Sequence, residues 1–197
     1  LLHNHIKMSR IYLVFALLVS ISLLMSYSDN PPNGKTGAPG DGLCTDCHSL
    51  GTGTQDGSIT VTGMPATIQP STMYVLTVTN SNPNGIAAEA GFQLTILNSN
   101  NQKAGLMTNP SSSSVVTPSG GREYWEHNPS VAYPGNNIVT WTVTWTSPVG
   151  PPGNTITAYV AGNVADGNDD DNNDLIVTST GTGMMAAGVP LEVDIIT

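Results

Sequence analysis

Short runs in which apolar and polar residues alternate recur through most of the chain. The strongest run covers residues 137–146, where Val139, Trp141, Val143 and Trp145 alternate with threonines. Successive side chains of a strand point to opposite faces, so this run predicts a strand with one buried and one exposed face. Further runs cover residues 58–62, 74–79, 91–97, 155–164, 175–178 and 191–196, with weaker ones at 104–107 and 114–117.

About seven to nine short strands with no amphipathic helix between them favour an all-β fold. Only 10% of the residues are charged, while glycine and proline number 21 and 14, a composition that suits strands joined by many turns. We therefore expect one antiparallel, Ig-like β-sandwich domain over residues 57–197.

The start of the sequence has the features of a secretory signal peptide. Residues 11–25 are almost wholly apolar, and Lys7 and Arg10 lie at or before their start. The run is shorter than the roughly 20 residues of a membrane-spanning helix. Residues 1–28 are thus predicted to be a cleaved signal helix, with an uncleaved anchor as the alternative. This predicts a bacterial protein that is secreted, extracellular or at the cell surface, with the periplasm as the alternative.

Residues 29–56 are predicted to be an extended arm. The part from 29 to 42 holds three prolines and four glycines and shows no periodicity. Such a segment cannot bury enough apolar surface to fold alone.

The arm leads into Cys44-Thr45-Asp46-Cys47-His48, which has the C-x-x-C-H spacing of covalent haem attachment. Two thiols at this spacing can each form a thioether with neighbouring vinyl groups on one porphyrin edge, and the adjacent histidine then reaches the iron. The sequence contains two cysteines in all. We expect one covalent haem c, held by Cys44 and Cys47, with His48 as proximal ligand. A disulfide and a zinc site are the alternatives.

His127 is predicted to be the second axial ligand of the haem iron. Without residues 1–28, His48 and His127 are the remaining histidines, and His127 follows Tyr124 and Trp125 in a stretch between the predicted strands. Bis-histidine ligation leaves no open iron site and favours electron transfer or a structural haem over oxygen chemistry, so no enzymatic activity is expected. The alternatives are a water or partner ligand, or one of Met64, Met73, Met107, Met184 and Met185.

A second candidate metal site lies in the acidic loop of residues 166–174. Five carboxylates and three side-chain amides fall within nine residues, and such a density of oxygen ligands suits calcium. The predicted ligands are Asp166, Asn168, Asp170 and Asp174, although the loop lacks the glycine and glutamate of an EF-hand. The alternative is a solvated acidic loop.

Three stretches of the sequence together resemble the choice-of-anchor V domain, a Reeler-like module of exported bacterial proteins. They are residues 30–49, residues 122–127, and residues 161–168 followed by 174–178. The resemblance implies an Ig-like, Reeler-like sandwich at the cell surface or outside the cell. It implies no particular biochemical role.

The formal net charge of −9 excludes nucleic acids and anionic membranes as partners beyond the leader, because their phosphates would be repelled. Three roles remain. The favoured one is a surface or filament subunit with a structural haem, a homo-oligomer joined through its arm or its edge strands. The second is a monohaem cytochrome that transfers electrons to a redox partner. The third is an adhesion or binding module with a calcium-stabilised loop.

Overall fold

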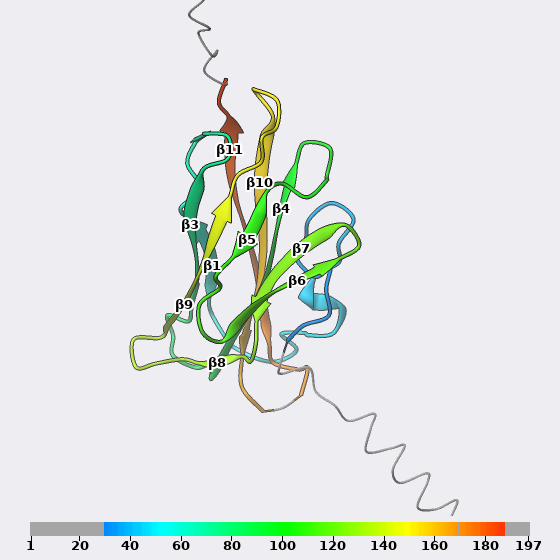
Figure 1. The fold of residues 1–197 in the computed structure, drawn as a ribbon. Coiled ribbons are helices and arrows are strands. Elements are labelled where there is room, and N and C mark those ends of the chain that lie inside the picture. The colour runs from blue at the N-terminus through cyan, green and yellow to red at the C-terminus, as the bar shows by residue number, and fades with distance from the viewer. Residues whose placement is uncertain (1–29, 169, 188–197) are drawn as a thin grey trace, which may run out of the picture.

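The computed structural model describes residues 30–168 and 170–187. They form two β-sheets packed face to face, which confirms the predicted all-β sandwich (Figure 1). The predicted leader and the predicted strand at 191–196 lie outside the described residues. The strands are β1 (Ser58–Thr62), β2 (Thr67–Ile68), β3 (Met73–Ser81), β4 (Glu89–Asn98), β5 (Leu106–Thr108), β6 (Ser114–Ser119), β7 (Arg122–His127), β8 (Val131–Ala132), β9 (Ile138–Thr146), β10 (Thr155–Ala165) and β11 (Leu175–Met185).

One sheet has the order β1-β3-β9-β5, and the other has the order β2-β11-β10-β4-β7-β6, with β8 paired to β4. The pairs are antiparallel except β2 with β11, which is parallel. No helix among residues 30–168 and 170–187 is long and apolar enough to cross a membrane.

Strand β9 follows the predicted alternation. Val139, Trp141, Val143 and Trp145 are buried between the sheets, while the threonines between them face outward. Trp141 packs on Phe92 of the opposite sheet, with ring centroids 4.6 Å apart. Period-two alternation thus marks a strand with one wet face, as in many antiparallel sheets.

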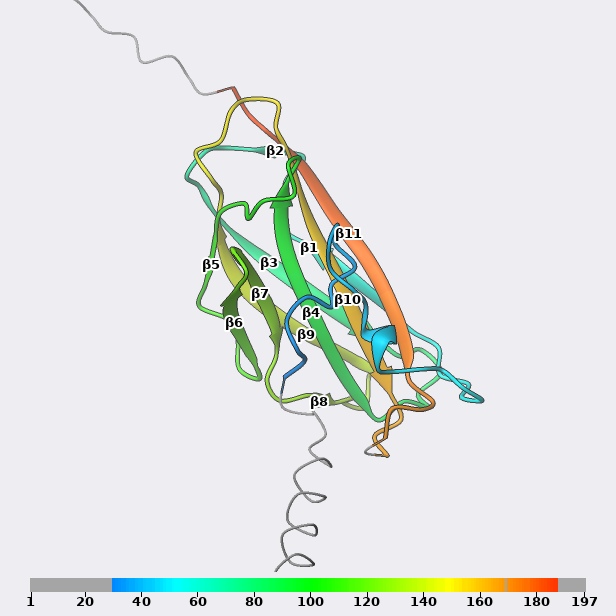
Figure 2. The same ribbon diagram turned by 90° about the vertical axis from the view of Figure 1, so that its right-hand side faces the viewer.

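Strand β4 departs from that alternation, because its side chains are buried on both faces. Gln93 and Thr95 are as inaccessible as the apolar residues on either side of them. Figure 2 shows the reason: residues 30–48 cross the outer face of β4 and β10. The predicted arm therefore covers its own sandwich.

Polar side chains of the sheet hold this arm in place. Gln93 Oε1 accepts a hydrogen bond from the Lys35 N–H at 2.6 Å, and Gln93 Nε2 donates to the Pro32 carbonyl at 3.2 Å. Arg122 pairs with Asp41 at 2.6 Å. Buried backbone groups of an irregular segment need such partners, so the arm is stabilised by polar contacts in place of an apolar core.

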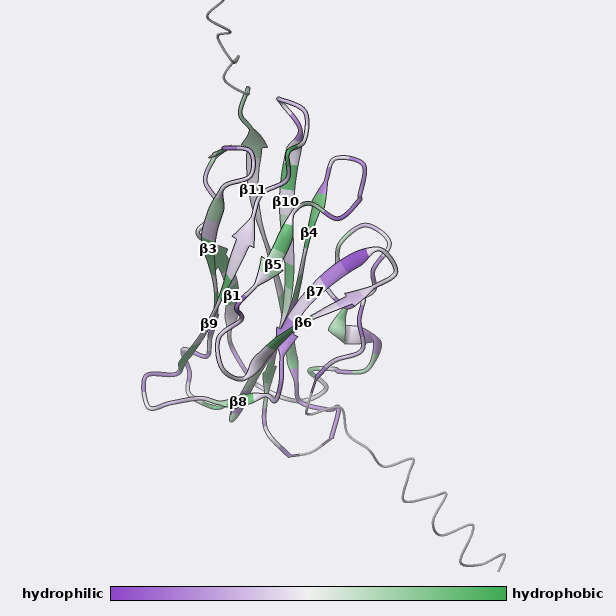
Figure 3. Ribbon diagram, viewed as in Figure 1, coloured by the Kyte–Doolittle hydropathy of each residue, from purple (hydrophilic) through white to green (hydrophobic). Residues whose placement is uncertain are grey.

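His127 is the last residue of β7, so its prediction as part of a stretch between strands is wrong. Figure 3 shows β7 as a hydrophilic strand, yet five of its six side chains are buried. The strand pairs with β6 along its length and with β4 at Glu126 and Trp125. Because both of its faces are covered, its sequence shows no alternation.

Candidate functional site

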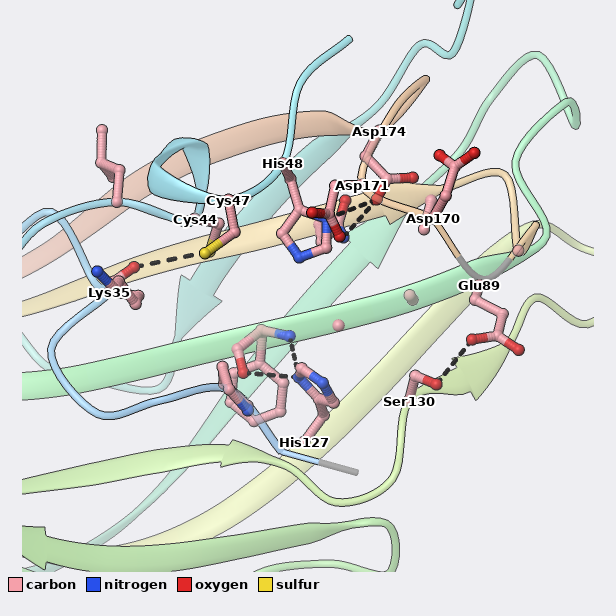
Figure 4. A pocket seen from close by; sticks show the side chains of 18 of the residues that line it. Lys35, Cys44, Cys47, His48, Glu89, His127, Ser130, Asp170, Asp171 and Asp174 are labelled. Atoms are coloured by element: carbon pink, nitrogen blue, oxygen red, sulfur yellow. Dashed lines mark hydrogen bonds and ion pairs between the residues drawn. The ribbon is translucent and has the colours of Figure 1, made fainter. Parts of the chain in front are cut away.

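A cavity of about 380 Å³ lies between the arm and the seven-stranded sheet, within the ~300–1,000 Å³ range of small-molecule sites. Cys44, Cys47 and His48 line it from the arm, and His127 lines it from β7 (Figure 4). The structure therefore brings together the four residues predicted to hold haem. The apolar part of the wall includes Pro31, Pro32, Leu43, Ala90 and Phe92.

A short 3-10 helix, η1 (Cys44–Asp46), shapes the cysteine motif. The N–H groups of Cys47 and His48 both donate to the carbonyl of Cys44, at 3.2 and 2.9 Å. Both cysteines are free thiols. This tight turn gathers the two thiols and the imidazole on the same cavity wall.

The two thiols differ in their surroundings. Burial raises the pKa of the Cys44 thiol to about 11, whereas Cys47 is exposed. Redox-active cysteines have a lowered pKa, because the thiolate is the reactive form. Cys44 is therefore a weak nucleophile at neutral pH.

The ring of His48 is oriented by a carboxylate from the far end of the sequence. Its Nδ1 lies 2.6 Å from Oδ2 of Asp174, a residue that is 2% exposed. The hydrogen bond to Asp174 is the main cause that raises the pKa of His48. In the neutral imidazole that donates its Nδ1–H to the carboxylate, Nε2 has its lone pair on the cavity side (Figure 4).

His127 is nine-tenths buried at the opposite wall. Its Nδ1 lies 2.9 Å from the amide nitrogen of Phe92 and 3.1 Å from its carbonyl oxygen, so either tautomer finds a backbone partner. Among the described residues, Nε2 has no hydrogen-bond partner. Burial lowers the pKa of His127 and keeps the imidazole neutral, the form that binds a metal ion.

The methionines considered as axial ligands lie elsewhere. Met107 and Met185 are buried in the sandwich, Met64 packs against the same core, and Met73 and Met184 are exposed. Within the described part of the chain, no methionine lines the cavity.

The four predicted calcium ligands do not converge on one point. The side-chain oxygens of Asp166, Asn168 and Asp170 each accept the backbone N–H two residues further on, which makes three successive Asx turns. Asp174 instead faces His48. In the ranges that the structure describes, no group of three or more His, Cys, Asp or Glu side chains could hold a metal ion by itself. Calcium binding therefore stays a prediction.

The sequence did not predict that His48 contacts Asp174 and also Asn163, whose Nδ2 lies 3.3 Å from His48 Nδ1. Residues 48 and 174 are 126 positions apart, and no periodicity or spacing links them. The density of carboxylates in the acidic loop indicated a bound cation and not an imidazole partner.

No protein-family model matches the chain, and no curated protein matches it. Among solved structures, the reeler domain of human F-spondin is similar at 18% identity and a TM-score of 0.42, over 70% of this chain and 96% of that one. A cohesin module of a Clostridium perfringens family 33 glycoside hydrolase is similar at 12% identity and a TM-score of 0.44, over 68% and 99%. AvmM, which catalyses macrocyclization in alchivemycin A biosynthesis, is similar at 15% identity and a TM-score of 0.41, over 69% and 92%.

Reeler domains are thus among the solved structures that the chain resembles, whereas no family model identifies it as a choice-of-anchor V domain. At these identities and TM-scores, nothing about the function of this chain follows from the similarity.

Proposed function

We propose that this is an exported monohaem protein, in which one covalent haem c joins the arm to the sandwich. Cys44 and Cys47 are the thioether residues, and His48 and His127 are the axial ligands. The observation that carries the proposal is that His127, which is 8% exposed and has no hydrogen-bond partner at Nε2 among the described residues, lines the same cavity as the C-x-x-C-H turn.

The residues present fit a haem in three further respects. Each imidazole has an acceptor for an Nδ1–H, Asp174 for His48 and the Phe92 carbonyl for His127, and in that tautomer both Nε2 atoms have a lone pair for the iron. Residue 91 beneath the His127 ring is glycine, and a side chain there would fill the space that the ring uses. Proline, leucine and phenylalanine side chains supply an apolar wall for the porphyrin.

A bound haem supplies one-electron redox chemistry and a covalent link to the two thiols. The chain's own residues hold and shield it. His48 and His127 would both bind the iron, and with both imidazoles bound the haem would offer no open site for oxygen chemistry. The arm covers the outer face of β4, where Gln93 and Thr95 are buried.

A structural role is the form of this function that the geometry supports best. Three of the four haem residues lie on the arm and the fourth on β7, so a haem bound to all four ties an irregular segment to the sheet. Since the arm packs on its own sandwich, edge strands such as β1 and β5 are the remaining route to the predicted homo-oligomer or filament.

Electron transfer to a redox partner is the second candidate. The exposed Cys47 at the cavity wall favours it, because a porphyrin edge joined to this residue would lie near the surface. A reversible midpoint in potentiometry supports this role, and the absence of any accessible midpoint contradicts it.

The test is export of the full sequence from a bacterium that attaches c-type haem. We expect a pyridine haemochrome spectrum of thioether-linked haem and a mass increase of one haem per chain. The double variant Cys44→Ala, Cys47→Ala should lose the covalent haem, while Met73→Leu, which changes an exposed methionine far from the cavity, should keep it. Exported wild-type protein without thioether-linked haem would refute the proposal.

A further inference from the structure

We infer that Asp174 is a positioning residue of this site, which holds His48 by its Nδ1 and strengthens it as a ligand. The inference rests on the proposed haem function. It deepens that function by assigning a role to a carboxylate outside the C-x-x-C-H motif and outside β7.

The contact between the Asp174 and His48 side chains is short, and the two side chains differ in their exposure. Asp174 Oδ2 lies 2.6 Å from His48 Nδ1, and the Asp174 side chain is 3% exposed whereas that of His48 is 33% exposed. A buried carboxylate is costly unless hydrogen bonds or an opposite charge compensate it. Here the imidazole of His48 is one of the groups that compensate the Asp174 carboxylate.

Asp174 is itself fixed from two directions. Asn163 of β10 donates its Nδ2–H to Oδ2 at 3.2 Å, and the backbone N–H of Asp166 donates to Oδ1 at 3.2 Å. With both oxygens engaged, the carboxylate has little freedom to rotate. The carboxylate that orients His48 is therefore fixed in its position.

The backbone next to His48 is tied to the same loop. The Ser49 N–H donates to the carbonyl of Asp171 at 2.8 Å, and the Asp174 N–H donates to the carbonyl of Ser49 at 2.9 Å. The C-terminal end of the C-x-x-C-H turn thus pairs with the segment that enters β11. These bonds place the imidazole and the carboxylate at a set separation before any ligand binds.

This arrangement has an electronic consequence for a metal bound at Nε2. A histidine that donates its other ring N–H to a carboxylate is a more basic ligand, and a more basic ligand favours the ferric over the ferrous iron. Asp174 should therefore lower the midpoint potential of the haem. Loss of such a partner typically weakens metal binding or activity about 10- to 100-fold.

The test compares two charge-removing variants of one loop. Asp174→Asn keeps the size of the side chain but weakens the hydrogen bond, whereas Asp171→Asn removes an equal charge that acts on His48 without a hydrogen bond to its ring. In haem-loaded protein, Asp174→Asn should shift the midpoint to higher potential with the low-spin spectrum kept. Asp171→Asn should shift it much less. Equal shifts of the midpoint potential in the two variants, or no shift in Asp174→Asn, would overturn the inference.

A second measurement does not need the haem. In the full chain produced without haem attachment, nitrogen-15 NMR of His48 should show a hydrogen-bonded Nδ1–H that Asp174→Asn weakens and Asp171→Asn leaves unchanged. If the NMR result is as expected but export yields no covalent haem, the proposed function fails while the hydrogen bond between His48 and Asp174 is confirmed. If haem attaches but wild-type His48 shows no such Nδ1–H, the inference about Asp174 fails and the proposed function stands.

If Asp174→Asn does not fold, two other measurements test the inference. One is the Nδ1–H signal of His48 in the wild-type protein. The other is the midpoint potential of Asp174→Glu, which keeps the charge but changes the hydrogen-bond geometry: an unchanged midpoint contradicts a role for the contact between Asp174 and His48.

Discussion

The imidazole of His127 lies directly against the Cα atom of Gly91, so that a Cβ at residue 91 would stand 2.8 Å from Cε1 of the ring. Real Cβ atoms do not approach other atoms that closely, so a side chain at residue 91 would displace the ring. Gly91 therefore sets the position of the imidazole in the cavity.

Gly91→Ala should move the His127 ring and weaken its bond to the iron. We expect a partial or complete change from the low-spin to the high-spin absorption spectrum, and a loss of about 1–3 kcal/mol in the free energy of unfolding from overpacking. Gly135→Ala is the matched control, because a Cβ at residue 135 meets nothing within 4 Å. An unchanged spectrum in a folded Gly91→Ala protein would argue against His127 as a ligand.

His127→Ala should remove the second axial ligand without removing the haem. The thioether residues and His48 remain, so the pyridine haemochrome spectrum should stay the same while the native protein becomes high-spin. Absorption and electron paramagnetic resonance spectra measure this change. Met64→Leu, which alters one of the alternative ligands, should leave the low-spin spectrum intact, and the reverse pattern would assign the ligand to Met64.

The two thiols of the haem-free chain should react at different rates. Burial raises the pKa of Cys44 from 9.0 to about 11, so at neutral pH it holds roughly one hundredth of the thiolate of an unperturbed cysteine, at tenfold per pKa unit. Iodoacetamide at pH 8 should modify the exposed Cys47 first, as peptide mass spectrometry would show. The rate at Cys44 should rise as the pH approaches 11. Equal rates at pH 8 would contradict the raised pKa of Cys44.

Gln93→Leu should release the arm from the sheet. The change removes the partners of the Lys35 N–H and the Pro32 carbonyl, and a buried group left without its partner costs about 1–3 kcal/mol. We expect lower stability in denaturant and faster proteolysis within residues 30–48. The control is Gln102→Leu at an exposed turn, and equal proteolysis of the two variants would show that Gln93 does not hold the arm.

Most of the strands could be predicted from residue periodicity alone, because β1, β3 and β9 have one face in the core and one in water. The prediction failed at β7 for a physical reason. Its second face is covered by the arm, where Asn30 contacts Glu126 and Asp41 contacts Tyr124, so the alternation that marks a half-exposed strand is absent. The sequence predicted the irregular arm but not its packing on the sheet.

The sequence by itself determined the chemistry available at the site. The spacing of Cys44, Cys47 and His48 is a property of five consecutive residues, and it needs no fold to be read. His127 could be predicted as the second haem ligand by elimination among a small number of histidines. These predictions depend on residue type and local spacing, which the sequence contains in full.

Only the tertiary structure decided how these residues meet. The cavity exists because the arm crosses β4, because β7 ends with His127 over Gly91, and because the loop before β11 returns Asp174 to His48. Each of these contacts joins segments far apart in the chain. Their proximity follows from the pairing of strands and the packing of the arm, and no local pattern of residues records it.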